Sequence, residues 1–497
     1  MAWQCPAGHM RGIDRACGWA EQGCRCIDLA SALEYHHQTE LLAYMTVGRR
    51  LTQPKYVKAQ GDIMTTPANA ASRCPFSAAA KNFMPFEQDF LDNPFSALKQ
   101  LRQTEPIFFD ERLGYWIVTR LDDAKAILRN SKDFSADVVL EPIVPLYQST
   151  IENFMRSGFS GGGGSLVNDV NPEHDERRKW LAKALTPQRV KELEPFVRDA
   201  VKKCVDDFVR DGEADLVKQL SSKVPAVVLM HFLGIPQEDI DRVKAWAEPT
   251  ILFSWGHPTE SDQNHMADML GEFWHYCKAH IAKLRGNLGD DVVSEAIRGQ
   301  QEKNLWTDDE LTRMTLNFVF AGHDTTVNAA ANMFLTLMQH RDAWNDLCRN
   351  RSLIPNAVEE CIRFAPAVIS HRRRAVNKVT VGGADIEPDD KVLIYFAAAN
   401  RDESTFDDGE VFNIHREGPN RHVTFGFGWH ACYGAPLARL EMKIMLEELT
   451  MRLPEIRLKP DQRFTYAPLN ITMRGPSNVV VQWNPESNPR PTDKLSR

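Results

Sequence analysis

The chain has 497 residues, of which 43% are hydrophobic and 25% charged, and it carries 28 Gly and 28 Pro. This is the composition of a globular protein with a sizeable core, and it excludes a disordered, collagen-like or coiled-coil chain. A formal net charge of −8 disfavours nucleic acid as the main partner. The best apolar run, residues 224–235, is too short for a membrane span, and no secretory signal opens the chain. We therefore expect a cytoplasmic monomer without membrane contact.

The N-terminal part of the chain differs from the rest. Residues 1–63 show no sustained periodicity, and we interpret them as a disordered extension or a gene-model artefact, with Met64 as the natural start. Residues 64–84 are interpreted as an arm, 85–487 as one folded domain and 488–497 as a tail. A zinc site in the extension is a weaker hypothesis, because its candidate ligands lack the paired short gaps of structural zinc sites. Those candidates are Cys5, His9, Cys17, Cys24 and Cys26.

The domain is predicted to be mainly helical with small sheets. Residues 108–109 and 115–119 predict a hairpin, and strands return near 378–386, 391–396 and 479–483. Amphipathic periodicity predicts helices at 121–130, 172–185, 189–211, 216–233, 237–246, 262–285, 290–300 and 308–339. Four glycines at 161–164 predict a mobile loop, which is not a phosphate cradle because no Lys-Ser/Thr pair follows.

The longest predicted helix contains an unusual centre. Thr307 and Glu310 form a capping box, and the helix would extend about 45 Å at ~1.5 Å per residue. Gly322, closely followed by two threonines, is costly in mid-helix, at about 1 kcal/mol for the glycine. The residues alone leave two interpretations open: a kink with threonines bonded back to the helix, or a functional opening.

A glycine-rich segment around Cys432 carries the most specific chemistry. Its glycines permit tight turns and close approach to a flat ligand, and a predicted helix begins just after Gly434. A helix N-terminus favours a thiolate, which serves as a nucleophile or a metal ligand. A protease would need a partner base, and His430 would face elsewhere. A single cysteine cannot hold zinc or a cluster, but it suffices as the protein ligand of haem iron.

Phe425, Gly428, His430, Cys432 and Gly434 match the haem-binding signature of the cytochrome P-450 superfamily, which this segment resembles position by position. The resemblance implies the cytochrome P-450 fold, with haem b between the long helix and the cysteine loop. It makes residues 85–487 a haem-binding monooxygenase domain. Cys432 would be the axial thiolate ligand, with Phe425 packed near its sulfur.

The centre of the long helix resembles the acid–alcohol pair of the same superfamily. Ala321 and Gly322 would lie against the cofactor, and Gly322 would open a groove for dioxygen. Asp324 and Thr325 would relay protons as a general-acid pair.

Two further sets of residues follow from the resemblance. Glu360 and Arg363 match a Glu-x-x-Arg motif with a structural role, and we expect Arg416 to complete their charge network. The haem propionates need Arg and His donors. The candidates are His174, Arg178, Arg373 and His430, with His422 as a weaker one.

Two runs, residues 353–361 and 446–454, resemble haem domains of the self-sufficient class, which carry a fused flavin and [2Fe–2S] reductase. No cysteine follows Cys432, so we expect neither cluster nor flavin in this chain. Electrons would come from a [2Fe–2S] ferredoxin and its reductase, or from an excised reductase domain. An acidic partner would dock on a basic patch. Its candidate residues are Arg177, Lys179, Lys183, Arg439 and Lys443.

The predicted activity is insertion of one oxygen atom of O2 into a small hydrophobic or aromatic substrate, by hydroxylation or O-, N- or S-dealkylation, as in xenobiotic degradation. Five segments are predicted to contact that substrate: residues 138–165, 251–255, 320–321, 368–370 and 469–472.

Two other classes stay open. One is a peroxide-driven haem-thiolate oxygenase or a dehydrating isomerase; Asp324 and Thr325 argue against both. The other is a non-catalytic haem-binding sensor, which would show no ligand-induced spin change and no turnover.

Overall fold

The structure, a computed structural model, describes residues 80–466 and 470–487. The predicted extension 1–63, most of the arm 64–84 and the tail 488–497 lie outside the described residues, as do the zinc candidates.

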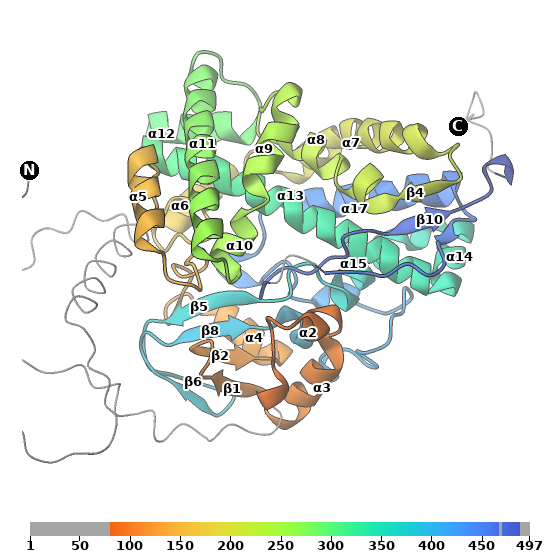
Figure 1. Ribbon diagram of the computed structural model, residues 1–497, viewed down its shortest axis with the longest axis horizontal. Coiled ribbons are helices and arrows are strands. Elements are labelled where there is room, and N and C mark those ends of the chain that lie inside the picture. Colours follow the sequence, from red (N-terminus) through yellow and green to blue (C-terminus); the bar gives the residue numbers. More distant parts are fainter. Residues whose placement is uncertain (1–79, 467–469, 488–497) are drawn as a thin grey trace, which may run out of the picture. The chain divides into compact units, whose positions relative to one another are not determined.

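Helices account for most of the described fold (Figure 1). In chain order they are α2 (Gln88–Asp92), α3 (Phe95–Thr104), α4 (Leu121–Arg129), α5 (Gln148–Ser157), α6 (Glu173–Leu181), α7 (Pro187–Phe208), α8 (Val224–Phe232), α9 (Ile240–Ala247), α10 (Thr250–Trp255), α11 (Glu260–Arg285), α12 (Val292–Lys303), α13 (Asp308–Gln339), α14 (Arg341–Arg349), α15 (Ile354–Phe364), α16 (Phe396–Ala399) and α17 (Ala435–Arg452). A π-helical turn covers Val217–Ser221, and a 3₁₀ turn at Gly428–His430 precedes the cysteine.

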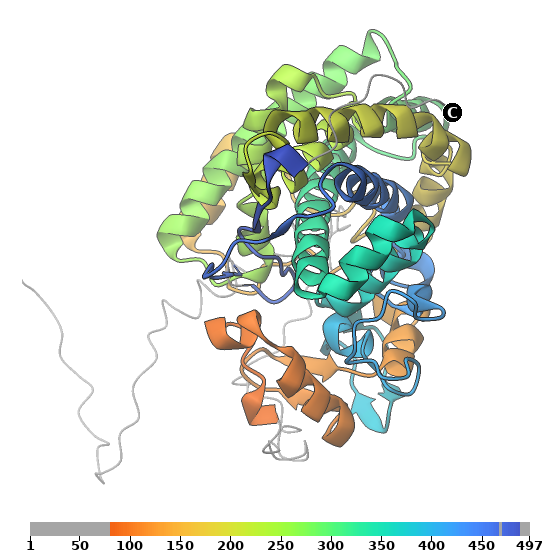
Figure 2. The same ribbon diagram turned by 90° about the vertical axis from the view of Figure 1, so that its right-hand side faces the viewer.

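Three small sheets complete the described architecture. The largest has the order β1-β2-β8-β5-β3, and its β2–β8 pair is the parallel one. Its strands are β1 (Ile107–Asp110), β2 (Tyr115–Val118), β3 (Phe134–Ser135), β5 (His371–Ala375) and β8 (Lys391–Ile394). The others are β4 (Glu213–Asp215) with β10 (Val480–Gln482) and β9 (Arg457–Leu458), and the hairpin β6 (Val379–Val381) with β7 (Ala384–Ile386). The five-stranded sheet and α2–α3 lie below the main group of helices in both views (Figures 1 and 2).

The long helix α13 is the central element. Thr307 and Glu310 form the predicted capping box, with the Thr307 hydroxyl accepting from the Glu310 N–H at 3.2 Å. The helix has 32 residues, or roughly 48 Å. It packs against α8, α11 and α15, and α15 also contacts α17.

The predicted fold class, mainly helical with small sheets, is confirmed. The bounds of α13 agree with the predicted 308–339, because its cap is encoded locally. The helix predicted at 216–233 is interrupted: a π-turn ends at Ser221 and α8 restarts at Val224, where Pro225 cannot donate to the preceding turn.

The glycine run at 161–164, which we predict to be a mobile loop, is a loop, and it is bonded to neighbouring segments at Gly163 and Gly164. Arg313 of α13 donates from Nε to the Gly163 carbonyl at 2.6 Å, and Asp169 accepts from the Gly164 N–H. A Cβ on Gly164 would lie 2.5 Å from the Glu310 Cβ, so glycine lets this loop pack directly on α13.

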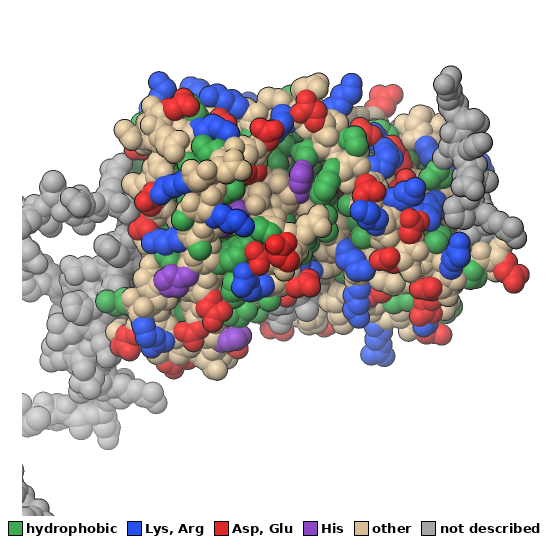
Figure 3. Space-filling view, turned by 90° about the horizontal axis from the view of Figure 1, so that it is seen from above, with side chains coloured by type: hydrophobic (Ala, Val, Ile, Leu, Met, Phe, Trp, Pro, Cys, Tyr) green, Lys and Arg blue, Asp and Glu red, His purple; other side chains and the backbone are tan. Residues whose placement is uncertain are grey.

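Basic and acidic side chains alternate on the face above α7, α8 and α11 (Figure 3). Among the described helices, none combines the length and apolarity that crossing a bilayer requires.

Candidate active site

Two glycines shape the loop that carries Cys432. Gly426 and Gly428 both have φ of +70°, a left-handed conformation that glycine adopts without steric cost. A Cβ on Gly428 would also lie 3.0 Å from the Arg129 Cα. The loop closes when the Cys432 N–H donates to the Phe425 carbonyl at 2.6 Å. This turn sets Cys432 directly before α17.

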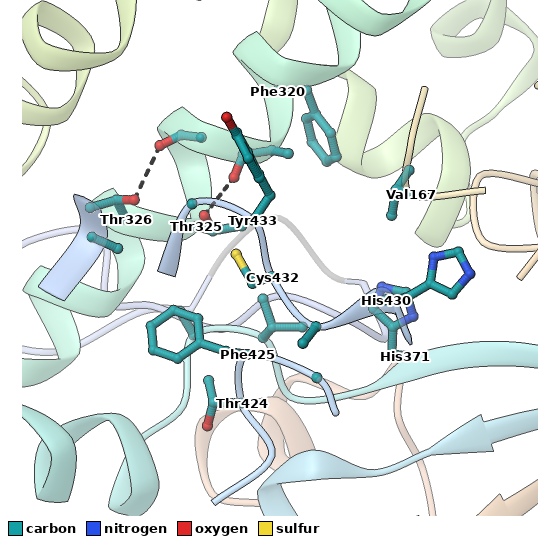
Figure 4. Close-up of a pocket in the computed structure, with 18 of the residues that line it drawn as sticks. Val167, Phe320, Thr325, Thr326, His371, Thr424, Phe425, His430, Cys432 and Tyr433 are labelled. Carbon is teal, nitrogen blue, oxygen red and sulfur yellow. Dashed lines mark hydrogen bonds between the residues drawn. The ribbon is translucent and has the colours of Figure 1, made fainter. Parts of the chain in front are cut away.

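The Cys432 side chain faces a cavity between this loop and α13. Its sulfur lies between Phe425 and Thr325 (Figure 4). Burial among protein atoms raises the pKa of the thiol, whereas the N–H groups of Gly434 and Ala435 and the Arg178 guanidinium act in the opposite direction. Donors that already point at the sulfur prepare this position for a thiolate.

The opposite wall comes from the middle of α13. Ala321, Gly322 and Thr325 line the cavity. The Thr325 hydroxyl donates to the Ala321 carbonyl at 2.6 Å, and that of Thr326 to the Gly322 carbonyl at 3.1 Å (Figure 4). Both threonines therefore bond back to the helix, as one of the two interpretations predicts.

Gly322 has a packing role as well. A Cβ at this position would lie 2.6 Å from Leu229 Cδ1 of α8. A glycine at this position thus permits the close approach of α8 to α13. The groove for dioxygen that the resemblance implies at Gly322 stays a prediction.

Asp324 lies outside the cavity lining. Its carboxylate contacts Nδ1 of buried His323 at 2.8 Å. The structure therefore brings Thr325 to the cavity and Asp324 to the side of α13.

One edge of the cavity is basic. Arg178 of α6, Arg373 of β5 and His430 line it, and the ring of His174 lies 3.9 Å from that of His430, centroid to centroid. His371 joins the same edge, with Nδ1 3.1 Å from Arg373 Nη1 (Figure 4 shows His371 beside His430).

Among the described residues, neither Arg178 nor Arg373 forms an ion pair at this edge, whereas His174 Nδ1 lies 3.2 Å from Asp175 Oδ1. Burial lowers the pKa of His430 to about 2, and the neighbouring Arg373, His174 and His371 reinforce this effect. Within the described residues, His174 Nε2 and His430 Nδ1 are buried and have no hydrogen-bond partner. Glu441 of α17 supplies the one carboxyl group among the described lining residues, and burial raises its pKa to about 8. The edge is therefore suited to an anionic ligand with several acceptor oxygens.

Sequence reasoning missed His371. Its signal is the alternation of a strand: residues two apart point to the same face, so His371 accompanies Arg373. The sequence analysis predicts no strand at His371–Ala375, so it does not indicate that these two residues share a face.

The structure places His422 elsewhere. The His422 side chain is buried, and its Nε2 lies 3.2 Å from Glu359 Oε2. It does not line the cavity that Cys432 faces. Arg439 donates from Nη2 to the same carboxylate at 3.0 Å, and its guanidinium lies 4.4 Å from the Phe425 ring centroid. His422 thus belongs to a network that supports the loop.

Glu360, Arg363 and Arg416 come together as a charge network. Arg363 donates to Glu360 from Nε at 2.7 Å and from Nη2 at 2.8 Å, and both side chains are fully buried. Arg416 Nε donates to Glu360 Oε1 at 3.2 Å. Arg363 also reaches the carbonyls of Asn400 and Gly409, which fixes the segment before the cysteine loop.

The predicted basic docking patch needs correction. Arg177 is buried and ion-paired with Asp169 at 3.0 Å and Glu310 at 2.6 Å, so it cannot form an exposed patch. Arg439 is bound to Glu359, and Lys443 lies 3.5 Å from Glu447. Sequence position alone did not reveal these acidic neighbours.

Apolar side chains form the remaining wall of the cavity. All five predicted substrate segments contribute residues to it, although residues 467–469 lie outside the described part. The contributors from these segments are Val139, Leu140, Ser165, Ile251, Trp255, Phe320, Ala321, Val368 and Thr472. Leu166, Val167, Leu229, Phe232 and Met473 add to them.

A thiol facing a long helix across an apolar cavity with one basic edge is the arrangement that a haem-thiolate site requires. A family model described as "Cytochrome P450" matches residues 88–453. The chain belongs to the cytochrome P450 family, whose monooxygenases are oxidoreductases, and the predicted fold and recognition are confirmed.

Individual relatives agree with this assignment. "Polyketide biosynthesis cytochrome P450 PksS" of Bacillus subtilis is 32% identical over 409 residues, covering 80% of this chain and 98% of the relative. An intact type IV self-sufficient cytochrome P450 monooxygenase has a TM-score of 0.81 at 39% identity, covering 84% of this chain and 54% of that one. The Tepidiphilus thermophilus P450 heme domain has a TM-score of 0.79 at 36% identity, covering 82% and 98%. This chain thus spans about half of the intact self-sufficient enzyme and nearly all of a separate heme domain.

The family implies haem, and the residues present fit it. Cys432 offers a thiol flanked by N–H donors, and the basic edge offers unpartnered nitrogens for two carboxylates. Gly434 lines the cavity, and no atom lies within 4 Å of a Cβ placed on it, so the space beside it is open to a flat ligand.

Proposed function

We propose that residues 85–487 form a haem-thiolate monooxygenase domain in which Cys432 holds the iron. Arg178, Arg373 and His430 would hold the propionates, with His174 stacked behind His430. The observation that carries the proposal is the placement of the Cys432 thiol opposite Ala321–Gly322, with the basic edge to one side.

The residues of α13 would handle protons. Bound haem would supply activation of dioxygen, with one oxygen atom inserted into the substrate. The Thr325 hydroxyl, now donating to the Ala321 carbonyl, can turn and offer its proton to the cavity. The Asp324 carboxyl group, held beside His323, would take up a proton from solvent on the outer side of the helix and, after a change of rotamer, pass it to the Thr325 hydroxyl.

The substrate we propose is a small, neutral apolar or aromatic molecule. Trp255 and Phe320 stack at 5.6 Å with an interplanar angle of 19°, and both line the cavity. The cations at the cavity are those of the propionate edge, so they would be neutralised by the cofactor and leave an uncharged pocket.

Electrons would enter from a separate acidic [2Fe–2S] partner near the cysteine loop. Lys125, Arg129 and Arg421 surround the loop, and Arg129 lies over the Phe427 ring at 4.7 Å. In the described part of the chain these three cations form no ion pair, unlike most of the patch predicted from sequence. We propose them as the docking surface.

The reduced, carbon-monoxide-bound absorption spectrum tests the proposal. We expect a strongly red-shifted Soret band in the wild type and its loss in Cys432→His, because only a thiolate ligand gives this shift. A wild-type band at the position typical of histidine-ligated haem would contradict the proposal. A thiolate band without substrate-induced spin change or turnover would instead indicate the non-catalytic sensor.

A further inference from the structure

Arg372 is a buried cation outside the cavity lining. It adjoins Arg373 on β5 and therefore points to the opposite face of the strand. Its side chain is almost fully buried, at 1% exposure. In the described part of the chain its guanidinium forms no ion pair, so the cost of burying the charge must be offset by other contacts.

Those contacts join two separate segments. Nη2 donates to the Val139 carbonyl at 2.6 Å and to the Ser254 carbonyl at 3.3 Å, and Nη1 donates to the Glu141 carbonyl at 2.8 Å. Val139 and Glu141 belong to the loop before α5, whereas Ser254 belongs to α10. One guanidinium thus fixes the loop to the helix.

The same guanidinium lies 5.4 Å from the ring centroid of Trp255. Trp255 also stacks on Phe320 at 5.6 Å, and its carbonyl accepts from the Ile471 N–H at 3.1 Å. Trp255 is therefore held by both Arg372 and Phe320, and it presents its remaining surface to the cavity.

We propose that Arg372 is a positioning residue for substrate: it holds the 139–141 loop against α10 and fixes the stacked Trp255–Phe320 pair as a rigid aromatic wall against which an aromatic substrate group packs. The inference rests on the proposed function. Arginine is required because a planar fork can serve several carbonyls while stacking on indole, whereas a lysine ammonium cannot do both.

Two haem ligands of different reach test this role in the haem-loaded protein. Imidazole binds at the iron alone, whereas 4-phenylimidazole extends a phenyl ring into the apolar cavity. We expect Arg372→Met and Arg372→Lys to raise the spectral Kd of 4-phenylimidazole about tenfold and that of imidazole less than about twofold. The reduced carbon-monoxide spectrum should keep its thiolate band.

The matched control is Arg341→Met. Arg341 also holds backbone carbonyls, those of Pro454 (3.0 Å) and Ile456, but it lies outside the cavity lining. This variant should lower the Tm and leave the ratio of the two Kd values unchanged. Equal weakening of both ligands in Arg372→Lys, or no weakening, would overturn the inference.

A double-mutant cycle gives a second test if Arg372→Met folds poorly. Trp255→Leu should weaken 4-phenylimidazole, and adding Arg372→Lys should cause little further loss, because the arginine acts through the indole. Additive losses would overturn the inference. Absence of the thiolate band from the reduced carbon-monoxide spectrum of the wild type would overturn the proposed function with it.

Discussion

Thr325 presents its hydroxyl to the cavity from the middle of α13, and its neighbour Thr326 makes the same type of bond one residue further on. The two side chains share a helix and a bonding pattern. Substitution of each threonine in turn therefore distinguishes an effect on proton delivery from an effect on the helix bond that both threonines make.

We predict that Thr325→Ala uncouples oxygen use from product formation. Without the hydroxyl, protons no longer reach the cavity through a fixed donor, so the amount of product formed per O2 consumed should fall about tenfold or more. Oxygen uptake, peroxide release and product should be measured together with an accepted substrate. Thr325→Ser should restore coupling, and Thr326→Ala should leave it near the wild-type value. Unchanged coupling in Thr325→Ala would contradict the relay and favour the peroxide-driven alternative.

Among single residues, local sequence was a good guide where chemistry is encoded in a short motif. Cys432, His430 and Arg373, which the resemblance names as candidates, all line the same cavity, and two of them, Cys432 and His430, are carried by one short loop. His422 was less predictable, since its partner Glu359 lies 63 positions away. The motif also does not predict the orientation of the Asp324 side chain, because the contact with His323 determines that orientation.

At the scale of elements, Glu359 joins α15 to α17 and to the segment before the cysteine loop. Hydrogen bonds from His422 and Arg439 outweigh the effect of burial and lower the pKa of Glu359 from its ordinary 4.5 to about 2. A carboxyl group with a lowered folded pKa stabilises the fold above its unfolded pKa. That contribution is lost as pH falls through the folded value.

We therefore predict that Glu359→Gln is less stable than the wild type at pH 7, by at most about 3 kcal/mol. The difference should persist down to about pH 4.5 and shrink as the pH falls toward 2. Urea unfolding of the haem-loaded proteins at several pH values measures it. Glu447→Gln, which removes a more exposed pairing with Arg198 and Lys443, should change stability by about 1 kcal/mol or less. A difference that grew on acidification would contradict the assignment.

Element boundaries show the same division between local and distant causes. The cap of α13 is local and was predicted, whereas α5 (Gln148–Ser157) lies in a segment assigned only as a substrate loop. α5 packs on α11, more than a hundred residues later in the chain, so its stability comes from a distant partner that periodicity does not reveal.

For the whole molecule, a net charge of −8 does not predict how an acidic electron donor would bind. Lys125 is partly buried, and burial lowers its pKa; nearby Arg421 and Arg129 act in the same direction, and Asp122 acts in the opposite one. The common location of the three cations beside the cysteine loop gives a positive region on an otherwise acidic protein.

We predict that electron transfer from an acidic [2Fe–2S] ferredoxin slows as ionic strength rises. The double variant Lys125→Glu/Arg421→Glu should reduce the rate about tenfold at low salt, measured as formation of the reduced carbon-monoxide complex. Reduction by dithionite should be unaffected. Lys183→Glu, an exposed member of the patch predicted from sequence, is the control and should retain the rate. If Lys183→Glu were the slower variant, the docking surface would be that earlier patch.

The sequence by itself determined the family, the mainly helical class and the long helix, and it singled out Cys432 as the candidate axial ligand, because short motifs and local caps encode each of them. Only the tertiary structure decided which charges are exposed, that His371 joins the basic edge and that Arg372 lies behind Trp255. The physical reason is that burial and pairing depend on contacts between segments far apart in the chain. Arg177 illustrates it: alone it is a surface cation, and beside Asp169 and Glu310 it is part of the core.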